Sequence, residues 1–384
     1  MGQQQMLLGA GGIPGQQCLT TSHTDLFGAH KYSGNANSWN GPDGGSPRNV
    51  VNNSNLLTNN ASNPGFVMTK SVQSNNNNGS GSYPGYGWNF NGTGLGYPIF
   101  WTWWQYMNMT NPNNRITDAA TYDNTHTGKG FTVQSNYMNY YNQDYGAFMF
   151  NESPYYMKVE TYTGNGAANH AIDHSLDCVP AVMIIKSIDN SNSNTNWTVY
   201  HYKAGNDKRF ILNRDTNNTS NKYEGVDWDT NAFNSQTPDR FKFYVGNSAA
   251  TNASGTTYMC ILFAGNHDEL DYSRFGGSCN QGFIGCNVYT GNGGSNTSQG
   301  LGFAPRCVWM FPEHGESAYG QYMIPAMSTN VSNLATTDIF FPGNTRAMYS
   351  GNFWTPSGSN TFTLNSSDNY CNRNGIKYYY LAFR

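Results

Sequence analysis

Two histidines four residues apart, His170 and His174, are followed closely by Asp177. Two imidazoles and a carboxylate are ligands that a transition metal accepts. Side chains at this spacing converge on a helix, but the segment lies between two expected strands. We therefore interpret it as a solvated connecting loop, and no metal ligand is assigned there.

Other stretches that could do chemistry lack the required spacing. The acidic segment 266–271 could offer oxygen ligands to Ca²⁺, but it lacks the alternating ligand positions and the turn glycine of a calcium loop, so a linker is favoured. The glycines of segment 9–15 lack the spacing of a dinucleotide-binding loop, and no strand is expected before them. The 23 acidic residues do not cluster in a recurring element, which disfavours glycoside cleavage. We expect a protein that is not an enzyme, with no catalytic residue, metal or cofactor.

An aromatic run offers the one candidate ligand-binding surface. Tyr86, Trp88, Trp101 and Trp104 could form a stacking platform for the rings of a glycan. The same run follows Pro98 and has the apolar character of a buried strand, so a place in the core or in a subunit interface is favoured over glycan binding.

The composition predicts an all-β protein. The chain has 384 residues, of which 43 are glycine, 27 tyrosine and 21 phenylalanine, and asparagine-rich turns separate short aromatic and β-branched runs. Only 11% of the residues are charged and the net charge is −3, so neither nucleic acid nor an anionic membrane is an expected partner. No apolar stretch approaches the roughly 20 residues of a membrane helix.

The cysteines and the first residues point to a protein made in a cytosol. Seven cysteines are scattered without a C-x-x-C pair, and only Cys279 and Cys286 are close enough for a loop disulfide, which the sequence leaves open. The first 17 residues have no basic segment and too short an apolar run for a signal peptide.

Three sequence elements recur in the same order three times along the chain. The first element is Tyr-Thr-Gly-Asn-Gly, which begins at Tyr162 and Tyr289 and has a weaker copy at Tyr32. Its glycines and Asn165 are expected to form a tight turn that needs positive φ.

The second and third elements are apolar strands with a fixed signature. The second is a proline that opens an apolar run, at Pro98, Pro180 and Pro305. The third is Asn-x-x-Gly-x-x-Tyr, or Asn-x-x-Asn-x-x-Tyr in the first copy, and a phenylalanine follows each tyrosine by five residues, at Phe150, Phe263 and Phe383. We expect positive φ at the middle position of this element.

Further short strands are expected between these elements. In 240–246, Phe241, Phe243 and Val245 alternate with Lys242 and Tyr244, which predicts a strand with one buried face. Other expected strands are 196–202, 209–213, 321–325, 337–342 and 360–365.

The repeat predicts three tandem β-sandwich or jelly-roll-like domains. After an N-terminal docking arm, 1–28, the expected domains are 29–156, 157–266 and 267–384. The first of them carries an Asn/Gly/Ser-rich insertion at about 37–94, interpreted as a long loop outside the core.

The repeated pattern resembles a β-domain that recurs, often in tandem, in tail-fibre-like and virion structural proteins of tailed phages, particularly marine and cyanobacterial ones. The middle copy has the fullest match, while the third lacks the Asn-Trp-x-Val-Tyr element. The matching residues are Tyr162, Pro180, Asn196, Trp197, Trp228, Pro238, Phe241, Asn252, Gly255 and Tyr258. The resemblance implies a virion structural or appendage protein, and it carries no catalytic residues.

Two functions from different classes follow as expectations. The first is a non-enzymatic virion protein, such as a capsid decoration, fibre or tail appendage, that forms a homo-oligomer and contacts other virion proteins. The second is a tail-fibre module that binds a host receptor or surface glycan.

Overall fold

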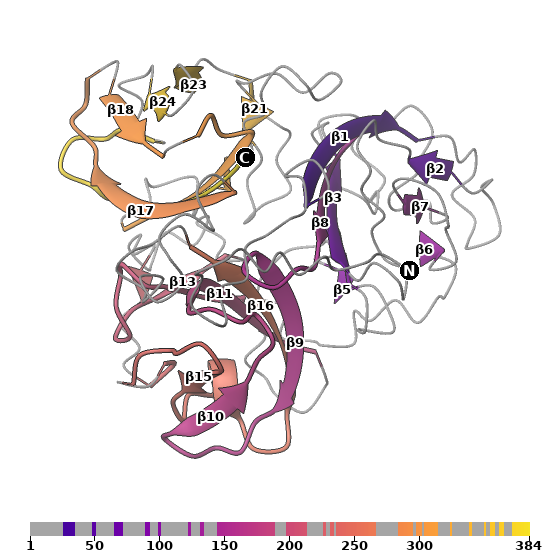
Figure 1. Ribbon diagram of the computed structural model, residues 1–384, viewed down its shortest axis with the longest axis vertical. Coiled ribbons are helices and arrows are strands. Elements are labelled where there is room, and N and C mark those ends of the chain that lie inside the picture. Colours follow the sequence, from indigo (N-terminus) through magenta and orange to yellow (C-terminus); the bar gives the residue numbers. More distant parts are fainter. Residues whose placement is uncertain are drawn as a thin grey trace, which may run out of the picture.

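The computed structural model is an all-β protein built from antiparallel sheets (Figure 1). Among the residues described below, a short helix, α2 (Ala249–Asn252), precedes the last strand of the second unit. The residues that the structure describes are 26–34, 48–50, 65–71, 89–92, 99–100, 122–123, 131–133, 144–188, 197–212, 226–227, 231–233, 236–265, 283–294, 297–301, 303–313, 323–324, 338–339, 349–350, 354–357, 361–364 and 371–384.

The chain forms three units, each with one main sheet of the same strand order. In every unit the first strand pairs with the last, the last with a middle strand, and the middle strand with the strand after it. Unit 2 contains β9 (Met157–Thr163), β16 (Thr257–Ala264), β11 (Pro180–Ser187), β12 (Thr198–His201), β13 (Arg209–Ile211) and β14 (Val226–Asp227) in this spatial order.

Units 1 and 3 repeat this arrangement with fewer strands in the main sheet. Unit 1 has the order β1 (Phe27–Ser33), β8 (Asp144–Asn151), β3 (Gly65–Ser71), β4 (Asn89–Gly92) and β5 (Ile99–Phe100). Unit 3 has the order β17 (Ile284–Thr290), β25 (Lys377–Phe383), β19 (Cys307–Pro312) and β20 (Met323–Ile324).

Each unit also has a small sheet next to its main sheet. The small sheet of unit 1 contains β2 (Arg48–Val50), β7 (Phe131–Val133) and β6 (Tyr122–Asp123); that of unit 2 contains β10 (His170–Asp173) and β15 (Lys242–Val245); that of unit 3 contains β18 (Thr297–Gly300), β24 (Thr361–Leu364) and β23 (Trp354–Ser357). The strands β21 (Asp338–Ile339) and β22 (Tyr349–Ser350) form a separate pair. The strands expected between the repeated elements are therefore confirmed in both later units.

The repeated tyrosines and phenylalanines of the sequence occupy equivalent places. The first-element and third-element tyrosines stack as Tyr32–Tyr145, Tyr162–Tyr258 and Tyr289–Tyr378, with ring centroids 5.1–5.2 Å apart. Each pair also lies opposite in the register of the first and last strands. The tyrosines of the predicted first and third elements are thus paired in all three units.

The three units share one hydrophobic core at their centre. Phe150, Phe263 and Phe383 end the last strand of each unit and contact one another, with ring centroids 5.2–5.8 Å apart. Trp309 packs edge-on against all three of these rings. A single cluster of buried side chains runs through the three units, while unit 3 has a second cluster of its own.

Polar contacts reinforce the junctions between units. Arg306 of unit 3 donates to the Phe27 carbonyl of unit 1 over 3.0 Å and lies over the Phe27 ring. Tyr202 of unit 2 donates to the Cys286 carbonyl of unit 3 over 3.1 Å. These bonds and the shared core join the three sheets into one body.

The structure corrects two expectations about unit 1. The second element was expected after Pro98. The strand that pairs with both the last strand, β8, and β4 is instead β3, which follows Pro64. Phe66, Val67 and Met68 of β3 are buried, so this part of the expected 37–94 loop belongs to the core. The strand after Pro98 is β5, a two-residue strand at the edge of the sheet.

Candidate functional site

The first repeated element binds the third through an asparagine pair, here called the asparagine clasp. In unit 2, the Asn252 side chain accepts from the Asn165 backbone N–H at 2.8 Å and donates to the Ala167 and Gly246 carbonyls at 2.8 Å. It also donates to Asn165 Oδ1 at 3.1 Å. Asn252 is fully buried, so these bonds replace water for a side chain that would otherwise be unsatisfied.

Unit 3 has the same clasp between Asn292 and Asn372. The Asn372 side chain accepts from the Asn292 backbone N–H at 3.1 Å and donates to Asn292 Oδ1 at 3.2 Å and to the Gly294 carbonyl. Two copies with the same bonds indicate that the repeated asparagines hold the first strand of a unit to its last.

The glycines of the first element serve two different purposes. Gly166 has φ of 72° and Gly293 has φ of 68°, which confirms the expected turn. Gly164 does not need positive φ; a Cβ atom there would overlap the Ala253 carbonyl oxygen of the third element. Asn165 also lacks positive φ, so the expectation for it was wrong, and its part is the clasp bond.

The third element has the backbone that the sequence predicted. Gly255 and Gly375 have φ of 78° and 80°. The equivalent residue in the first copy, Asn142, lies outside the described residues.

Groups with reactive chemistry elsewhere in the chain are enclosed in the core. Cys286 Sγ lies 3.3 Å from His201 Nε2, but both side chains have at most 1% of their surface exposed. Burial raises the pKa of the Cys286 thiol well above its usual range, so the thiol is protonated. Burial also lowers the pKa of Lys186 to about 7, yet this side chain has only 3% of its surface exposed. Cys279, the other half of the disulfide left open by the sequence, lies outside the described residues.

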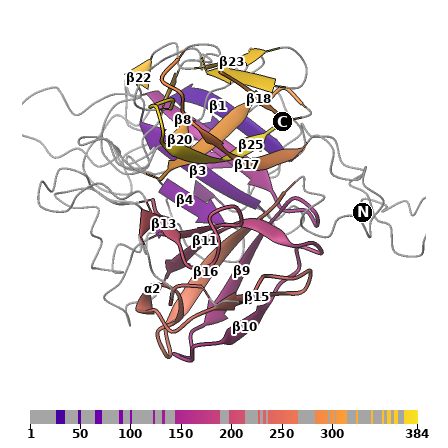
Figure 2. The same cartoon turned by 90° about the vertical axis from the view of Figure 1, so that its left-hand side faces the viewer.

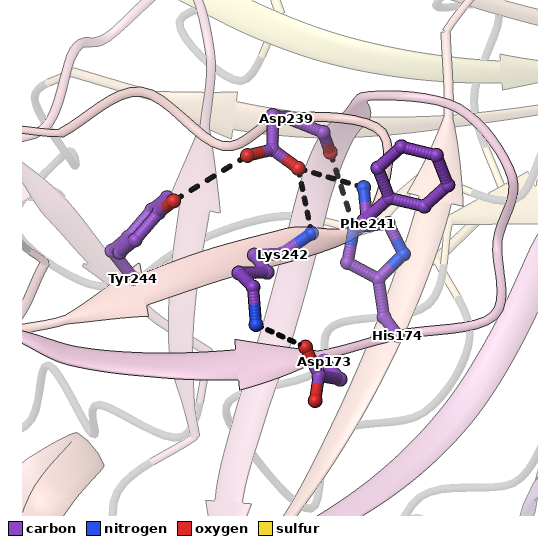
Figure 3. A network of polar contacts seen from close by, with 6 residues as sticks. All are labelled: Asp173, His174, Asp239, Phe241, Lys242 and Tyr244. Atoms are coloured by element: carbon purple, nitrogen blue, oxygen red, sulfur yellow. Dashed lines mark hydrogen bonds and ion pairs between the residues drawn. The ribbon is translucent and has the colours of Figure 1, made fainter.

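An exposed feature with well-defined hydrogen bonds lies at the unit 2 tip, defined as residues 173–174 and 239–244. Asp239 Oδ1 accepts from the backbone N–H groups of Phe241 at 2.7 Å and Lys242 at 2.8 Å (Figure 3). The Asp239 N–H donates to the Lys242 carbonyl at 2.8 Å, and the His174 N–H donates to the Phe241 carbonyl at 2.9 Å. The turn before β15 is therefore fixed by backbone and carboxylate bonds.

Phe241 projects from this fixed turn into solvent. Its side chain is 60% exposed, and it is the one exposed large hydrophobic side chain in the part of the chain that the structure describes. The Arg240 guanidinium lies over its ring, 5.2 Å from the centroid. The expected buried face of 240–246 is confirmed for Phe243 and Val245 but is wrong for Phe241, because the strand begins only at Lys242.

Two further polar contacts lie at the unit 2 tip. Lys242 forms an exposed ion pair with Asp173 across the small sheet, and Tyr244 Oη lies 3.4 Å from Asp239 Oδ2 (Figure 3). The hydrogen bond that Lys242 donates to Asp173 lowers the pKa of Asp173 and raises the pKa of Lys242. Two acidic and two basic residues meet at this tip, so its net charge is zero.

The two histidines singled out in the sequence contact different parts of unit 2. His170 begins β10, so the interpretation as a loop was wrong for 170–173, whereas His174 lies in the connection after this strand. His170 Nδ1 is 2.9 Å from Asn252 Oδ1 in the clasp, and His174 Nε2 is 3.2 Å from the Asp239 carbonyl at the tip. Desolvation lowers the pKa of His174. Within the described residues no group of three metal-ligating side chains converges.

The candidates for glycan stacking stay predictions. Tyr86, Trp88, Trp101 and Trp104 lie outside the described residues, as do the acidic segment 266–271 and the glycines of 9–15. Among the described residues there is no helix with the length and apolar character needed to cross a bilayer.

The fold and the clasp define a class of all-β proteins made of repeated, clasped units. Residues 99–267 and 161–384 match the model of a family described as a domain of unknown function, DUF7483. The chain belongs to this family. The two matches end at residues 267 and 384, shortly after the last strands of units 2 and 3. No curated protein and no solved structure matches the chain.

Proposed function

We propose that the protein is a non-enzymatic structural component of a bacteriophage particle, such as a capsid decoration, a fibre or a tail appendage. The observation that carries the proposal is what the repeated residues do. The stacked tyrosines, the clasp asparagines and the central phenylalanines all hold strands or units together. A sequence pattern that recurs in every unit and holds strands or units together is typical of a structural protein.

In the described part of units 2 and 3, three side chains with reactive chemistry are buried, which supports the non-enzymatic part of the proposal. Cys286, His201 and Lys186 have the chemistry of nucleophiles or bases, but each is enclosed by the core. A general base or nucleophile must lie within hydrogen-bond reach of its substrate. These three side chains are instead part of the packing between and within units.

The assignment to a virion rests on the resemblance of the repeated pattern to phage β-domains. The composition supports it, because only 11% of residues are charged and tyrosine is abundant. Tyrosine faces form hydrogen-bonded interfaces without a strongly apolar free surface. The protein is therefore placed in the virion, where its partners are further copies of itself and other virion proteins.

Each unit is proposed to be a sandwich-like domain. The main and small sheets of unit 2 meet where Tyr162 packs edge-on against Phe243, with ring centroids 5.8 Å apart. In unit 3, Phe362 packs edge-on against Tyr380 with centroids 5.5 Å apart. Facing sheets that bury aromatic side chains between them are the defining feature of a sandwich.

Because the inner ends of the units are enclosed in the shared core, association with other copies is assigned to outer faces. One chain supplies three similar units around a common centre, so it presents the outline of a small trimer. Homo-oligomers of the chain then form through contacts other than the phenylalanine cluster.

Quantitative mass spectrometry of density-purified particles of the phage that encodes this chain tests the proposal. The expected result is a copy number at least that of known minor virion proteins, retained after nuclease treatment and high-salt washing. Absence of the chain from washed particles, together with its recovery as a soluble monomer, would contradict the proposal.

The second candidate function, binding of a host receptor or surface glycan through residues 86–104, keeps the aromatic residues Tyr86, Trp88, Trp101 and Trp104 as its basis. Saturable binding of the chain to host cells that is lost on alanine substitution of these residues would support it.

A further inference from the structure

Three asparagine–glycine pairs lie among the residues whose side chains the structure describes. They are Asn165-Gly166 and Asn292-Gly293 in the first elements of units 2 and 3, and Asn374-Gly375 in the third element of unit 3. All three asparagines are exposed. An asparagine before a glycine is prone to deamidation, because glycine has no side chain to keep its backbone nitrogen away from the asparagine side chain. Exposure does not distinguish the three pairs, but their hydrogen bonds do.

The clasp of unit 2 restrains the first of these pairs. Asn165 Oδ1 accepts from the Ala167 backbone N–H at 2.8 Å and from the Asn252 side chain at 3.1 Å. The Gly166 N–H donates to the Asn252 carbonyl at 2.9 Å. The nitrogen that would attack and the side chain that it would attack are therefore both bonded, so three hydrogen bonds must open before the reaction.

The pair in the first element of unit 3 has the same restraints. Asn292 Oδ1 accepts from the Gly294 N–H at 2.9 Å and from the Asn372 side chain at 3.2 Å. The Gly293 N–H donates to the Asn372 carbonyl at 2.9 Å. This pair is therefore also held by three hydrogen bonds.

The pair in the third element of unit 3 is restrained by the backbone alone. The Gly375 N–H donates to the Gly291 carbonyl at 2.8 Å, whereas the structure gives the Asn374 side chain no hydrogen bond to a described residue. The pair lies just before β25, which is the neighbour of β17 in the main sheet (Figure 2). The equivalent of Asn374 in unit 2 is Ser254, so this chemistry is absent from the third element of that unit.

From these differences we infer that Asn374 is a site of spontaneous deamidation. The Gly375 backbone nitrogen attacks Asn374 Cγ, so that a bond from this nitrogen to Cγ forms and the bond from Cγ to Nδ2 breaks. Ammonia leaves with the proton of the Gly375 N–H, and the product is a cyclic imide, a succinimide. Water then opens this ring at either carbonyl and gives aspartate or isoaspartate. No oxidant or reductant takes part.

The relative rates at the three pairs depend on the hydrogen bonds that must open. Reaction from a locally opened state requires three bonds to break at Asn165 or Asn292, and one bond at Asn374. Each bond contributes a modest net free energy, and two additional bonds together slow the reaction by about tenfold or more. Asn374 therefore reacts first in the folded chain.

Deamidation of Asn374 weakens the contact between the first and third elements of unit 3. Isoaspartate adds a carbon atom to the backbone before Gly375, which shifts the Gly375 N–H away from the Gly291 carbonyl. The clasp residue Asn372 lies in the same turn, shortly before Asn374. The modified chain thus has a loosened clasp in unit 3 and an unchanged clasp in unit 2. This inference holds whether or not the chain is part of a virus particle.

The test incubates the purified full chain in mildly alkaline buffer and follows deamidation at each pair by mass spectrometry of proteolytic peptides. An unincubated sample corrects for deamidation during digestion. The same incubation in guanidinium gives the rates in the unfolded chain, which lacks these hydrogen bonds. Asn374→Ser is the matched variant, because it places the residue of unit 2 at this position.

A second measurement examines the clasp. Ion exchange separates the deamidated chain, which has an additional negative charge, from the intact chain. Hydrogen exchange then compares the two forms in the segment of Asn292 in unit 3 and in the segment of Asn165 in unit 2, which is the internal control.

The expected result is deamidation at Asn374 that is about tenfold or more faster than at Asn165 and Asn292 in the folded chain. In guanidinium the three rates become similar, and Asn374→Ser removes the charge variant. Hydrogen exchange becomes faster in the segment of Asn292 alone.

Two sets of results overturn the inference. A folded chain in which Asn374 reacts no faster than the clasped asparagines contradicts the site, and an equal preference for Asn374 in guanidinium contradicts protection by the hydrogen bonds. Unchanged hydrogen exchange near Asn292 contradicts the loosened clasp. None of these outcomes depends on the particle measurement above.

Discussion

Replacement of Asn252 by alanine tests the asparagine clasp directly. The side chain is fully buried, and three of its hydrogen bonds join it to the backbone groups of Asn165, Ala167 and Gly246. At about 1 kcal/mol for each bond, Asn252→Ala lowers the free energy of unfolding by about 3 kcal/mol. The loss is larger if the buried backbone groups stay without water.

The assay is guanidinium unfolding followed by circular dichroism and by the fluorescence of buried tryptophans, such as Trp197 in unit 2 and Trp309 in unit 3. Asn372→Ala should cause a loss of similar size in unit 3, since its clasp has the same pattern. Ser254→Ala, an exposed change in the same segment, is the control. If Asn252→Ala unfolds within about 0.5 kcal/mol of the unmodified chain, the clasp does not hold the unit together and the reasoning fails.

Three further outcomes follow from the same structure. Phe383→Ala removes a ring that contacts the equivalent phenylalanines of both other units, and it should lower the free energy of unfolding by about 3–5 kcal/mol in a urea titration; an unchanged midpoint would contradict the shared core. Gly164→Ala forces Cβ against a backbone carbonyl and should cost about 1–3 kcal/mol, whereas Gly300→Ala has open space and should be near neutral by the same titration. Desolvation lowers the pKa of His174 in the folded protein, so the contribution of the neutral imidazole to stability is fully present above about pH 6.5 and is lost as the pH falls through the folded pKa. His174→Gln should therefore flatten the decline of the denaturant unfolding midpoint between pH 7.5 and 5. An unchanged decline would refute the assignment of this pH dependence to His174.

The repeat could be predicted from sequence because its residues are constrained in every copy. A tyrosine that must stack on its partner and a phenylalanine five residues later that must reach the centre leave a fixed spacing in the chain. The glycine turn could also be predicted from the sequence, because Gly166 has positive φ and few other residues accept this conformation.

The middle strand of unit 1 was misplaced because the signature used for it is not unique. A proline followed by apolar residues occurs at Pro64 and at Pro98. Leu95, three residues before Pro98, favoured the second, because a leucine also lies four residues before Pro180 and Pro305. Only pairing distinguishes them: β3 lies between β8 and β4, whereas β5 has a single neighbour. Pairing between distant strands depends on contacts that local sequence does not encode.

The unit 2 tip could not be recognised because alternation does not reveal where a strand begins. Phe241 fits the same two-residue period as Phe243 and Val245, yet it precedes the first paired residue and is turned outward. The one signal for it in the sequence is Asp239, two residues earlier, whose short side chain is suited to accept backbone N–H groups in a turn. The clasp bond of Asn165 was missed for a similar reason, because the preference of asparagine for turns favoured its interpretation as a turn residue.

The most direct test of the central claim, that clasped β-units form a building block of a virus particle, is electron microscopy of particles whose copy of this chain carries an added tag. We expect gold label at fixed positions on intact particles, over density with three lobes around a common centre. Particles without label, while tagged chain accumulates in the soluble fraction of infected cells, would contradict it.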